Sequence, residues 1–191
     1  MIITENIDED LSDEEVVNLV LEDANCFAVV ISRYKVKLFN YIRRITNIRE
    51  EDVEDLLQEI FLKVYLNINS FDQTMKFSSW IYAIARNQTI SHFRKIKVRP
   101  EGYLEVIDDE MANRLKMDFD LIDHIDKKEQ QARIAKALFK LKSKYRELII
   151  LKFIEEKSYQ EISDIIKKPT GTVGSMLNKA KEDLRKILSQ K

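Results

Sequence analysis

The sequence predicts an all-α protein of two small helical domains, joined by a flexible acidic linker, with a helix-turn-helix in the C-terminal domain. Only 3 glycines and 2 prolines occur among 191 residues, whereas leucine, isoleucine, glutamate and lysine, which suit helices better than sheets, are abundant. Apolar residues also recur at spacings of three and four through most of the chain, which is the period of helices that bury one face. This period lapses over 100–119, so we place the domains at 1–99 and 120–191.

The composition excludes several classes of site. A single cysteine, Cys26, leaves no internal disulfide framework and no cysteine-based zinc site. His92 and His124 lie far apart in sequence, so we expect no histidine-ligated metal and no cofactor. The sequence has neither an apolar run near the roughly 20 residues of a membrane span nor a signal-peptide pattern. We therefore expect a cytoplasmic protein without direct membrane insertion.

Charge is divided into zones although the net charge is only −1. The stretch 73–100 has six basic residues and no acidic one, 101–126 has nine acidic and two basic residues, and 127–191 has seventeen basic and eight acidic ones. Two basic zones separated by an acidic one indicate two DNA-contacting modules joined by a segment that avoids DNA. The alternative for the C-terminal zone is a set of solvated, lysine-rich helix faces.

A capping box predicts the first helix, and a stripe of apolar residues predicts the second. Ser12 and Glu15 form a capping box that starts a short acidic helix. A second helix covers about 25–45, where apolar residues at three- and four-residue spacing form one stripe. Both helices are therefore expected to contribute to one bundle.

A third helix, over about 51–67, has two different faces. Apolar residues from Val53 to Ile68 point toward a core. The other side presents polar residues, which are Asp52, Asp55, Gln58 and Glu59. This side is either a solvated face or a surface for a partner that presents arginine or lysine.

The basic stretch 73–100 also contains interleaved aromatic residues. Charges of this kind follow phosphates and flat rings stack on bases, so we interpret the stretch as a helix that melts DNA and reads bases. A cap at Ser78 or Ser79 would start this helix after a loop. Tyr82 and Arg86 are then expected on its exposed side. The alternative is that the aromatic residues at helical spacing belong to a core.

The C-terminal domain has the clearest local signals. Ser158 and Glu161 form a second capping box, Pro169 forces a turn, and a last helix follows from Thr170. A short helix, a tight turn and a longer helix make a helix-turn-helix, whose second helix enters the major groove of DNA. The alternative is a plain helical hairpin.

Three sequence motifs then resemble a known family. They are D-V-E-D-L-L-Q-E-I-F-L-K-V-Y over 52–65, F-D-Q-T-M-K-F-S-S-W-I-Y-A-I-A-R-N over 71–87 and S-Y-Q-E-I-S-D-I-I-K-K-P-T-G-T-V-G-S over 158–175. In this order and spacing they resemble bacterial RNA polymerase sigma factors of the extracytoplasmic-function (ECF) group. That group has the second and fourth sigma regions joined by a variable linker.

The resemblance implies a transcription initiation factor that binds bacterial core RNA polymerase, melts the −10 element of promoter DNA and binds the −35 element. It implies region 2 in 1–99, region 4 in 120–191, and an anti-sigma factor, possibly membrane-bound, as regulator. Core polymerase docking is implied for Asp52, Asp55, Gln58 and Glu59. The implied −10 contacts are Asn69, Ser70, Phe71, Lys76, Phe77, Ser78, Trp80, Tyr82, Arg86, Asn87, Arg94 and Lys95. The implied −35 contacts are Thr170, Gly171, Thr172, Ser175, Asn178, Lys179 and Lys181.

The sequence contains no catalytic constellation, so we expect no enzyme. One departure from the family is that Gly174 and Met176 occupy positions that are often basic. Two other functions remain open. The C-terminal module alone would serve a polymerase-independent helix-turn-helix transcriptional regulator, although that leaves 73–100 unexplained. A helical protein-interaction module without DNA function is the second.

Overall fold

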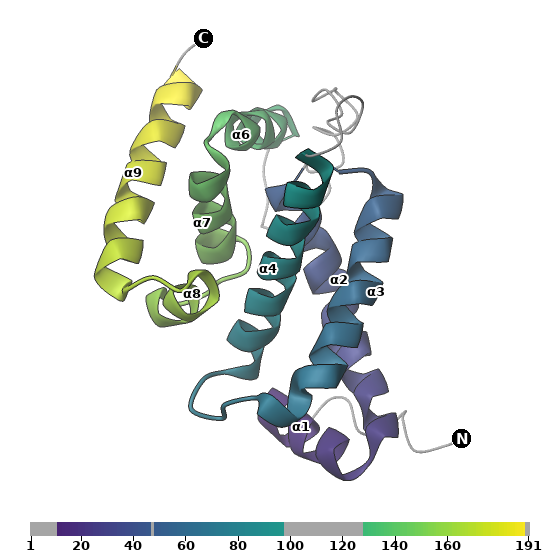
Figure 1. The fold of residues 1–191 in the computed structure, drawn as a ribbon. Coiled ribbons are helices and arrows are strands. Elements are labelled where there is room, and N and C mark those ends of the chain that lie inside the picture. The colour runs from purple at the N-terminus through teal and green to yellow at the C-terminus, as the bar shows by residue number, and fades with distance from the viewer. Residues whose placement is uncertain (1–10, 47, 98–127, 190–191) are drawn as a thin grey trace.

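The computed structural model describes residues 11–46, 48–97 and 128–189. All the regular secondary structure in these residues is helical (Figure 1). The predicted all-α class is confirmed. The expected linker at 100–119 and the expected resumption of helix near Asp120 lie outside the described residues. In chain order the elements are α1 (Asp13–Glu22), the 3₁₀ turn η1 (Ala24–Cys26), α2 (Phe27–Ile45), α3 (Glu50–Asn67), the 3₁₀ turn η2 (Ile68–Ser70), α4 (Phe77–Lys97), α6 (Lys128–Lys140), α7 (Ser143–Phe153), α8 (Tyr159–Ile166) and α9 (Thr170–Ser189).

Helices α2, α3 and α4 form an N-terminal bundle, with α1 packed across one end (Figure 1). The apolar stripes that the sequence predicts meet in its centre. Residues there with no exposed surface are Leu38, Tyr41, Ile42, Val53, Ile60, Val64 and Ile81. Burying side chains of this size contributes about 1.5–3 kcal/mol each relative to exposure, so these stripes account for the association of the three helices.

The C-terminal domain contains the predicted helix-turn-helix, formed by α8 and α9. The capping box at Ser158 is present, since its hydroxyl accepts from the Glu161 N–H while the Glu161 carboxylate accepts from the Ser158 N–H. Helix α8 ends at Lys167, which has φ 54°, and Pro169 separates this left-handed residue from α9. The turn therefore follows from local sequence, as expected.

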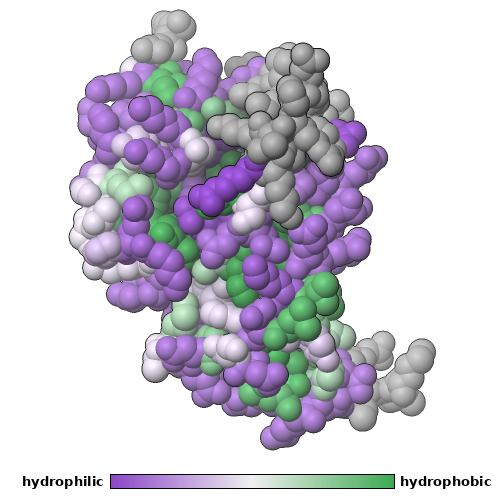
Figure 2. Space-filling model, in the orientation of Figure 1, coloured by the Kyte–Doolittle hydropathy of each residue, from purple (hydrophilic) through white to green (hydrophobic). Residues whose placement is uncertain are grey.

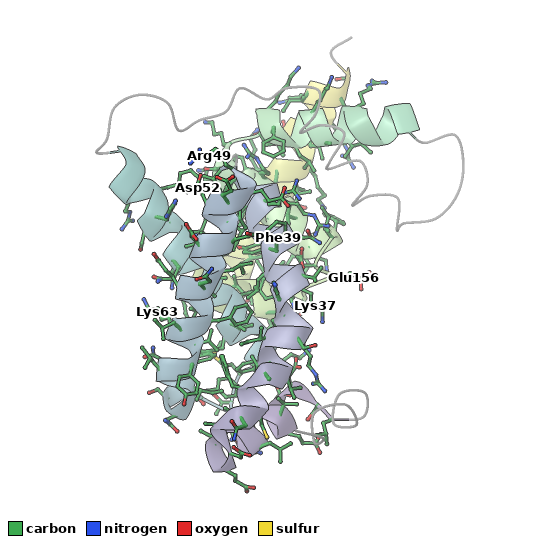
Figure 3. All side chains as sticks on the ribbon, turned by 90° about the vertical axis from the view of Figure 1, so that its right-hand side faces the viewer. Lys37, Phe39, Arg49, Asp52, Lys63 and Glu156 are labelled. Carbon is green, nitrogen blue, oxygen red and sulfur yellow. The ribbon has the colours of Figure 1, made fainter. Side chains whose placement is uncertain are left out.

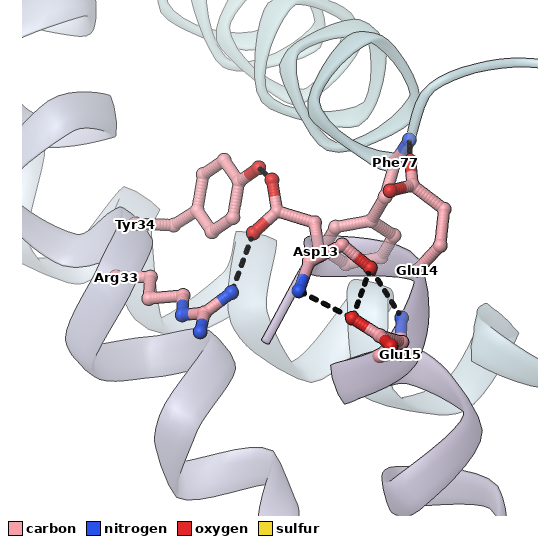
Figure 4. A network of polar contacts seen from close by, with 7 residues as sticks. Asp13, Glu14, Glu15, Arg33, Tyr34 and Phe77 are labelled. Carbon is pink, nitrogen blue, oxygen red and sulfur yellow. Dashed lines mark hydrogen bonds and ion pairs between the residues drawn. The ribbon is translucent and has the colours of Figure 1, made fainter. Parts of the chain in front are cut away.

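A side chain from α1 caps the N-terminus of α4 (Figure 4). The Phe77 N–H donates to Oε1 of Glu14 at 3.0 Å. The expected cap by Ser78 or Ser79 is wrong, because α4 begins at Phe77 and both serines lie in its first turn. A second link joins Nε2 of Gln73, in the preceding loop, to Oδ1 of Asn18 at 3.1 Å. Helix α1 thus fixes the start of α4.

Removing the Glu14 carboxylate should measurably lower stability. We expect Glu14→Ala to reduce the free energy of unfolding by about 1–2 kcal/mol, as for loss of a helix cap, whereas Glu14→Gln keeps an oxygen acceptor and should lose less. Urea unfolding provides the measurement, with Glu22→Ala on the same helix as control. Equal stability of all three variants would contradict the capping role.

The two domains pack directly against each other, which the sequence did not indicate. Helix α8 lies against α4, and α7 lies against α2 (Figure 1). Buried residues of both domains form one continuous apolar cluster, from Val16 in α1 to Ala180 in α9. Part of the surface of α4 that faces away from its own bundle is therefore covered by the C-terminal domain.

Candidate nucleic-acid and partner interface

The polar side of α3 faces solvent at three of its four predicted docking residues. Asp55, Gln58 and Glu59 are exposed. Asp52 is instead engaged locally, because Nε of Arg49 lies 3.1 Å from its Oδ2 and its side chain is 13% exposed (Figure 3). The structure therefore presents an acidic stripe of Asp55 and Glu59 with Gln58 beside it.

An apolar groove of about 600 Å³ runs between α2 and α3, next to that stripe. Its lining residues are Ile31, Lys35, Val36, Phe39, Glu54, Leu57, Gln58 and Phe61. Gln58 belongs to both the groove and the polar side of α3. Sequence reasoning missed the groove because two helices build it, but Val36, which is 66% exposed, was a signal: an apolar residue outside the buried stripe of α2.

Further apolar side chains are exposed near the C-terminal half of α3. Leu62 and Leu66 are 60% and 67% exposed, and Leu21 of α1 is 46% exposed. Figure 2 shows hydrophobic side chains gathered over this end of the molecule, where α1 and α3 lie, against a mainly hydrophilic remainder of that face. Exposed apolar residues that gather in one place indicate a surface for another macromolecule.

The aromatic residues at the start of α4 pack on one another. The ring of Phe71 lies 5.4 Å from the rings of both Phe77 and Trp80, centroid to centroid. Phe77 is 1% exposed, whereas Phe71 and Trp80 are half-buried and Asn69 and Ser70 are exposed. Phe77 therefore belongs to the core, which is the alternative that the sequence left open for the aromatic residues. The loop before α4 and part of Trp80 remain accessible.

Tyr82 and Arg86 do not lie on an exposed side, so this expectation is wrong. Tyr82 is 1% exposed, and its hydroxyl donates to Oε2 of Glu155 at 2.5 Å. Nε of Arg86 donates to Oε1 of Glu147 at 2.7 Å. The helix does turn these two residues away from its own bundle, but the C-terminal domain covers them.

The same two acids also bind α2. The hydroxyl of Tyr41 donates to Oε1 of Glu147 at 3.0 Å, and Arg44 donates to Oε1 of Glu155 at 2.9 Å. Side-chain exposures of 9% for Arg44 and 8% for Glu155 place that pair away from water. Glu147 and Glu155 therefore each bind one residue of α2 and one residue of α4.

The buried tyrosines should ionise late. Burial, and then the nearby Glu155, raise the pKa of Tyr82 far above its ordinary 10.0, and burial with Glu147 does the same to the pKa of Tyr41. Because each pKa is higher in the folded protein than in the unfolded one, the contribution of the two neutral tyrosines to the free energy of unfolding is complete below about pH 10. That contribution is lost as the pH rises beyond this value. In an alkaline absorbance titration we expect Tyr41 and Tyr82 to ionise only when the protein unfolds, which gives a late phase of absorbance change. Tyr82→Phe should reduce the amplitude of this late phase, and an unchanged amplitude would contradict the burial of Tyr82.

The remaining α4 positions differ in accessibility. Asn87 and Arg94 are exposed and Ser78 is half-buried. Lys76, whose side chain is 69% exposed, lies 3.4 Å from Oε1 of Glu161, a pairing too exposed to hold it firmly. The side chain of Lys95 lies outside the described residues.

The predicted recognition helix α9 exposes most of its N-terminal positions. Those in solvent are Thr170, Gly171, Thr172, Ser175, Asn178 and Lys179. Lys181 does not share their surface: it lines a groove of about 340 Å³ with apolar residues of α6 and α7. Gly174 is half-buried, and a Cβ there would lie 3.7 Å from the ring of Tyr159. Gly174 therefore lies at the α8–α9 contact.

Two family models match the chain in the order of its domains. Residues 30–99 match Sigma-70 region 2, and residues 131–184 match Sigma-70, region 4. The ECF RNA polymerase sigma factor SigW of Bacillus subtilis is 39% identical over 87% of this chain and 90% of SigW. The chain belongs to the ECF RNA polymerase sigma factors. The resemblance drawn from the three motifs is thereby confirmed.

Another relative is also an ECF sigma factor. The ECF RNA polymerase sigma-E factor of Escherichia coli K12 is 27% identical over 91% of this ECF sigma factor and 93% of the relative. Two solved structures share the fold: CnrH in complex with the cytosolic domain of CnrY (TM-score 0.68, 22% identity, 92% and 96% of the two chains) and RpoE of Bartonella quintana (TM-score 0.60, 22% identity, 86% and 97%).

Membership establishes the function at the level of the family. This ECF sigma factor is a transcription initiation factor that binds RNA polymerase and directs it to promoters, and the family is non-catalytic. The polymerase-independent regulator is not favoured, because both sigma regions are present. Among the described residues no helix is long and apolar enough to cross a membrane, and no cluster of candidate ligands would hold a metal ion.

Proposed function

We propose that this ECF sigma factor docks on core RNA polymerase through α3, opens and reads the −10 element with α4 and the loop before it, and binds the −35 element with α9. In this proposal 1–99 is the docking and −10 domain, 100–119 the linker, and 120–191 the −35 domain. The observation that supports it most is the solvent-facing stripe of Asp55, Gln58 and Glu59 beside an apolar groove.

The docking assignment rests on that combination of charge and apolar surface. A protein interface that lasts needs an apolar centre with a polar rim, and the groove between α2 and α3 supplies the first while Asp55 and Glu59 supply the second. Asp52 acts through its pairing with Arg49, holding the N-terminal turn of α3, and contributes least to the contact itself.

The residues implied for −10 contact differ in accessibility. Asn69, Ser70, Lys76 and Asn87 face solvent, so they contact bases or phosphates first. Phe71 and Trp80 offer ring faces at the edge of the aromatic cluster, and Phe77 supports them from inside. Stacking contributes about 1–3 kcal/mol per captured base, which offsets the few kcal/mol that unstacking costs.

The −35 assignment uses the N-terminal turns of α9. Thr170, Thr172, Ser175 and Asn178 supply short hydrogen-bonding side chains for base edges, and Gly171 lets the backbone come near the duplex. Lys179 supplies phosphate contact once it leaves Asp183, 3.0 Å away on the exposed surface. Lys181 contributes only if its long side chain reaches around the helix.

We also propose an anti-sigma factor as regulator and the cytoplasm as location. Two proteins of the same fold were solved with such partners: CnrH with the cytosolic domain of CnrY, and RpoE with the anti-sigma factor NepR. Location in the cytoplasm follows from the proposed partner, because core polymerase works there.

The test is holoenzyme formation. The full chain mixed with purified core polymerase should co-elute with it from a sizing column, and binding of duplex promoter DNA should require the polymerase. Tight duplex binding by the chain alone at moderate salt, with no co-elution, would instead support a polymerase-independent regulator.

A further inference from the structure

We infer that Lys167 and Lys168, in the turn between α8 and α9, each contact a DNA phosphate beside the −35 element and supply the anchoring charge that the N-terminal half of α9 lacks. Neither lysine is among the residues that the family resemblance implies for the −35 contact. The inference rests on the proposed function of α9. It adds two contact residues and places them outside the recognition helix.

The half of α9 that meets DNA in the proposed function is uncharged. Residues 170–178 include no basic and no acidic residue. The first cation of the helix, Lys179, already has partners, since its Nζ lies 3.3 Å from Oε2 of Glu182 and 3.0 Å from Oδ1 of Asp183. Affinity for duplex DNA depends strongly on protein cations that replace the counterions of the phosphates. The −35 contact therefore needs cations from a neighbouring segment.

Two such cations lie directly before α9. Lys167 and Lys168 are exposed, and neither side chain has an ion-pair or hydrogen-bond partner among the residues that the structure describes. Only Pro169 separates Lys168 from Thr170, the first residue of α9. When the N-terminal residues of a recognition helix contact base edges in the major groove, the segment before the helix lies near the backbone at the groove edge. Both lysines are thus placed for phosphates while α9 faces bases.

The backbone of Lys167 provides a second, independent argument. Lys167 ends α8 with φ 54°, in the left-handed region. Glycine adopts this conformation without steric cost and is the usual residue at such a helix end, whereas a residue with a Cβ is strained there. Strained backbone positions of this kind cluster at functional sites. A lysine at a position that favours glycine therefore indicates a use for its side chain.

The turn fixes the backbone of both lysines before DNA binds. The Lys168 N–H donates to the carbonyl of Ser163 at 3.2 Å, and the Ser163 hydroxyl donates to the carbonyl of Lys168 at 2.6 Å. The Lys167 N–H donates to the same Ser163 carbonyl, and Pro169 restricts the conformation of Lys168. Because this backbone is already ordered, binding costs less conformational entropy than it would for a flexible loop.

The experiment measures binding of the holoenzyme to a promoter fragment recovered by mapping transcription start sites. Lys167→Gly with Lys168→Gln removes both charges and retains the backbone bonds of the turn. Affinity at physiological salt should fall about tenfold or more, and the slope of log affinity against log salt should become shallower by about 2, because two phosphate contacts are lost. The melting temperature should stay the same or rise, since glycine relieves the left-handed strain at position 167.

Two controls locate the effect. Lys140→Gln with Lys142→Gln removes two exposed lysines of the same domain, at the connection between α6 and α7, and should change neither the affinity nor the salt slope. A promoter fragment that ends downstream of the −35 element removes the duplex that the turn would contact. The holoenzymes with the original chain and with the Lys167 and Lys168 variant should bind this shorter fragment equally.

Unchanged affinity and salt slope in the Lys167 and Lys168 variant would overturn the inference, and so would equal losses in the Lys140 and Lys142 control. If the double variant fails to fold, Lys168→Gln alone decides: the slope should become shallower by about 1, and an unchanged slope would overturn the inference. Failure of the proposed function gives a different result, because the original holoenzyme would then bind the full and the shorter fragment equally well.

Discussion

Reversing two charges on α3 should abolish holoenzyme formation while leaving the fold intact. Asp55→Lys with Glu59→Lys places two cations where a basic partner would dock, and like-charge contacts across an interface cost several kcal/mol, so affinity for core polymerase should fall at least about 100-fold. Both residues are exposed, so the melting temperature should change little. Co-elution with core polymerase and promoter-dependent transcription provide the measurements.

The control for this variant makes the same change of charge elsewhere. Glu22→Lys with Glu156→Lys alters two exposed acids away from α3 and should leave co-elution and transcription as they are. Undiminished transcription by the Asp55 and Glu59 variant would refute the docking surface. Equal losses in both variants would show that net charge, rather than this face, governs binding.

Removing two accessible side chains of the proposed −10 surface should impair promoter opening but not docking. Lys76→Ala with Asn87→Ala removes one charge and one amide, both exposed, so neither substitution disturbs the core. If the two side chains together contribute about 1.4–2.8 kcal/mol, which is within the range of one base contact, open complexes should become about 10- to 100-fold fewer. Permanganate footprinting of the melted region measures this directly.

A template with a pre-opened bubble distinguishes melting from reading. If the two residues act mainly in opening the duplex, the bubble should restore most of the transcription. The matched control, Lys140→Ala with Ser32→Ala, removes one lysine and one polar residue that are also exposed but lie on α6 and α2, outside the proposed surface. Normal open complexes with the Lys76 and Asn87 variant would contradict the assignment.

Local structure was predictable because its causes lie within a few residues. The capping boxes at Ser12 and Ser158 appear in the structure as expected, and so does the turn around Pro169. The family was predictable for the same reason, since its three motifs are short and contiguous. The polar side of α3 was recognisable because the buried stripe beside it has a clear helical period.

Long-range packing was not predictable in this way. The period of α4 indicates one face for Ile81 and another for Tyr82, but it cannot say what covers the second face. Tyr82 is buried by a partner 73 positions away, and the acids Glu147 and Glu155 lie in a domain whose charge is mainly basic. The cap on Phe77 from Glu14 likewise joins two helices that no local pattern connects.

Transcription by purified core polymerase together with this protein, on fragmented genomic DNA with start sites mapped, measures whether the protein directs the polymerase to promoters. We expect start sites that share a two-part upstream sequence, with one element at the melted region and the other on the duplex reached by α9. Asp55→Lys with Glu59→Lys should abolish all these starts. An absence of protein-dependent transcripts, or starts without a shared sequence, would contradict the proposed promoter recognition.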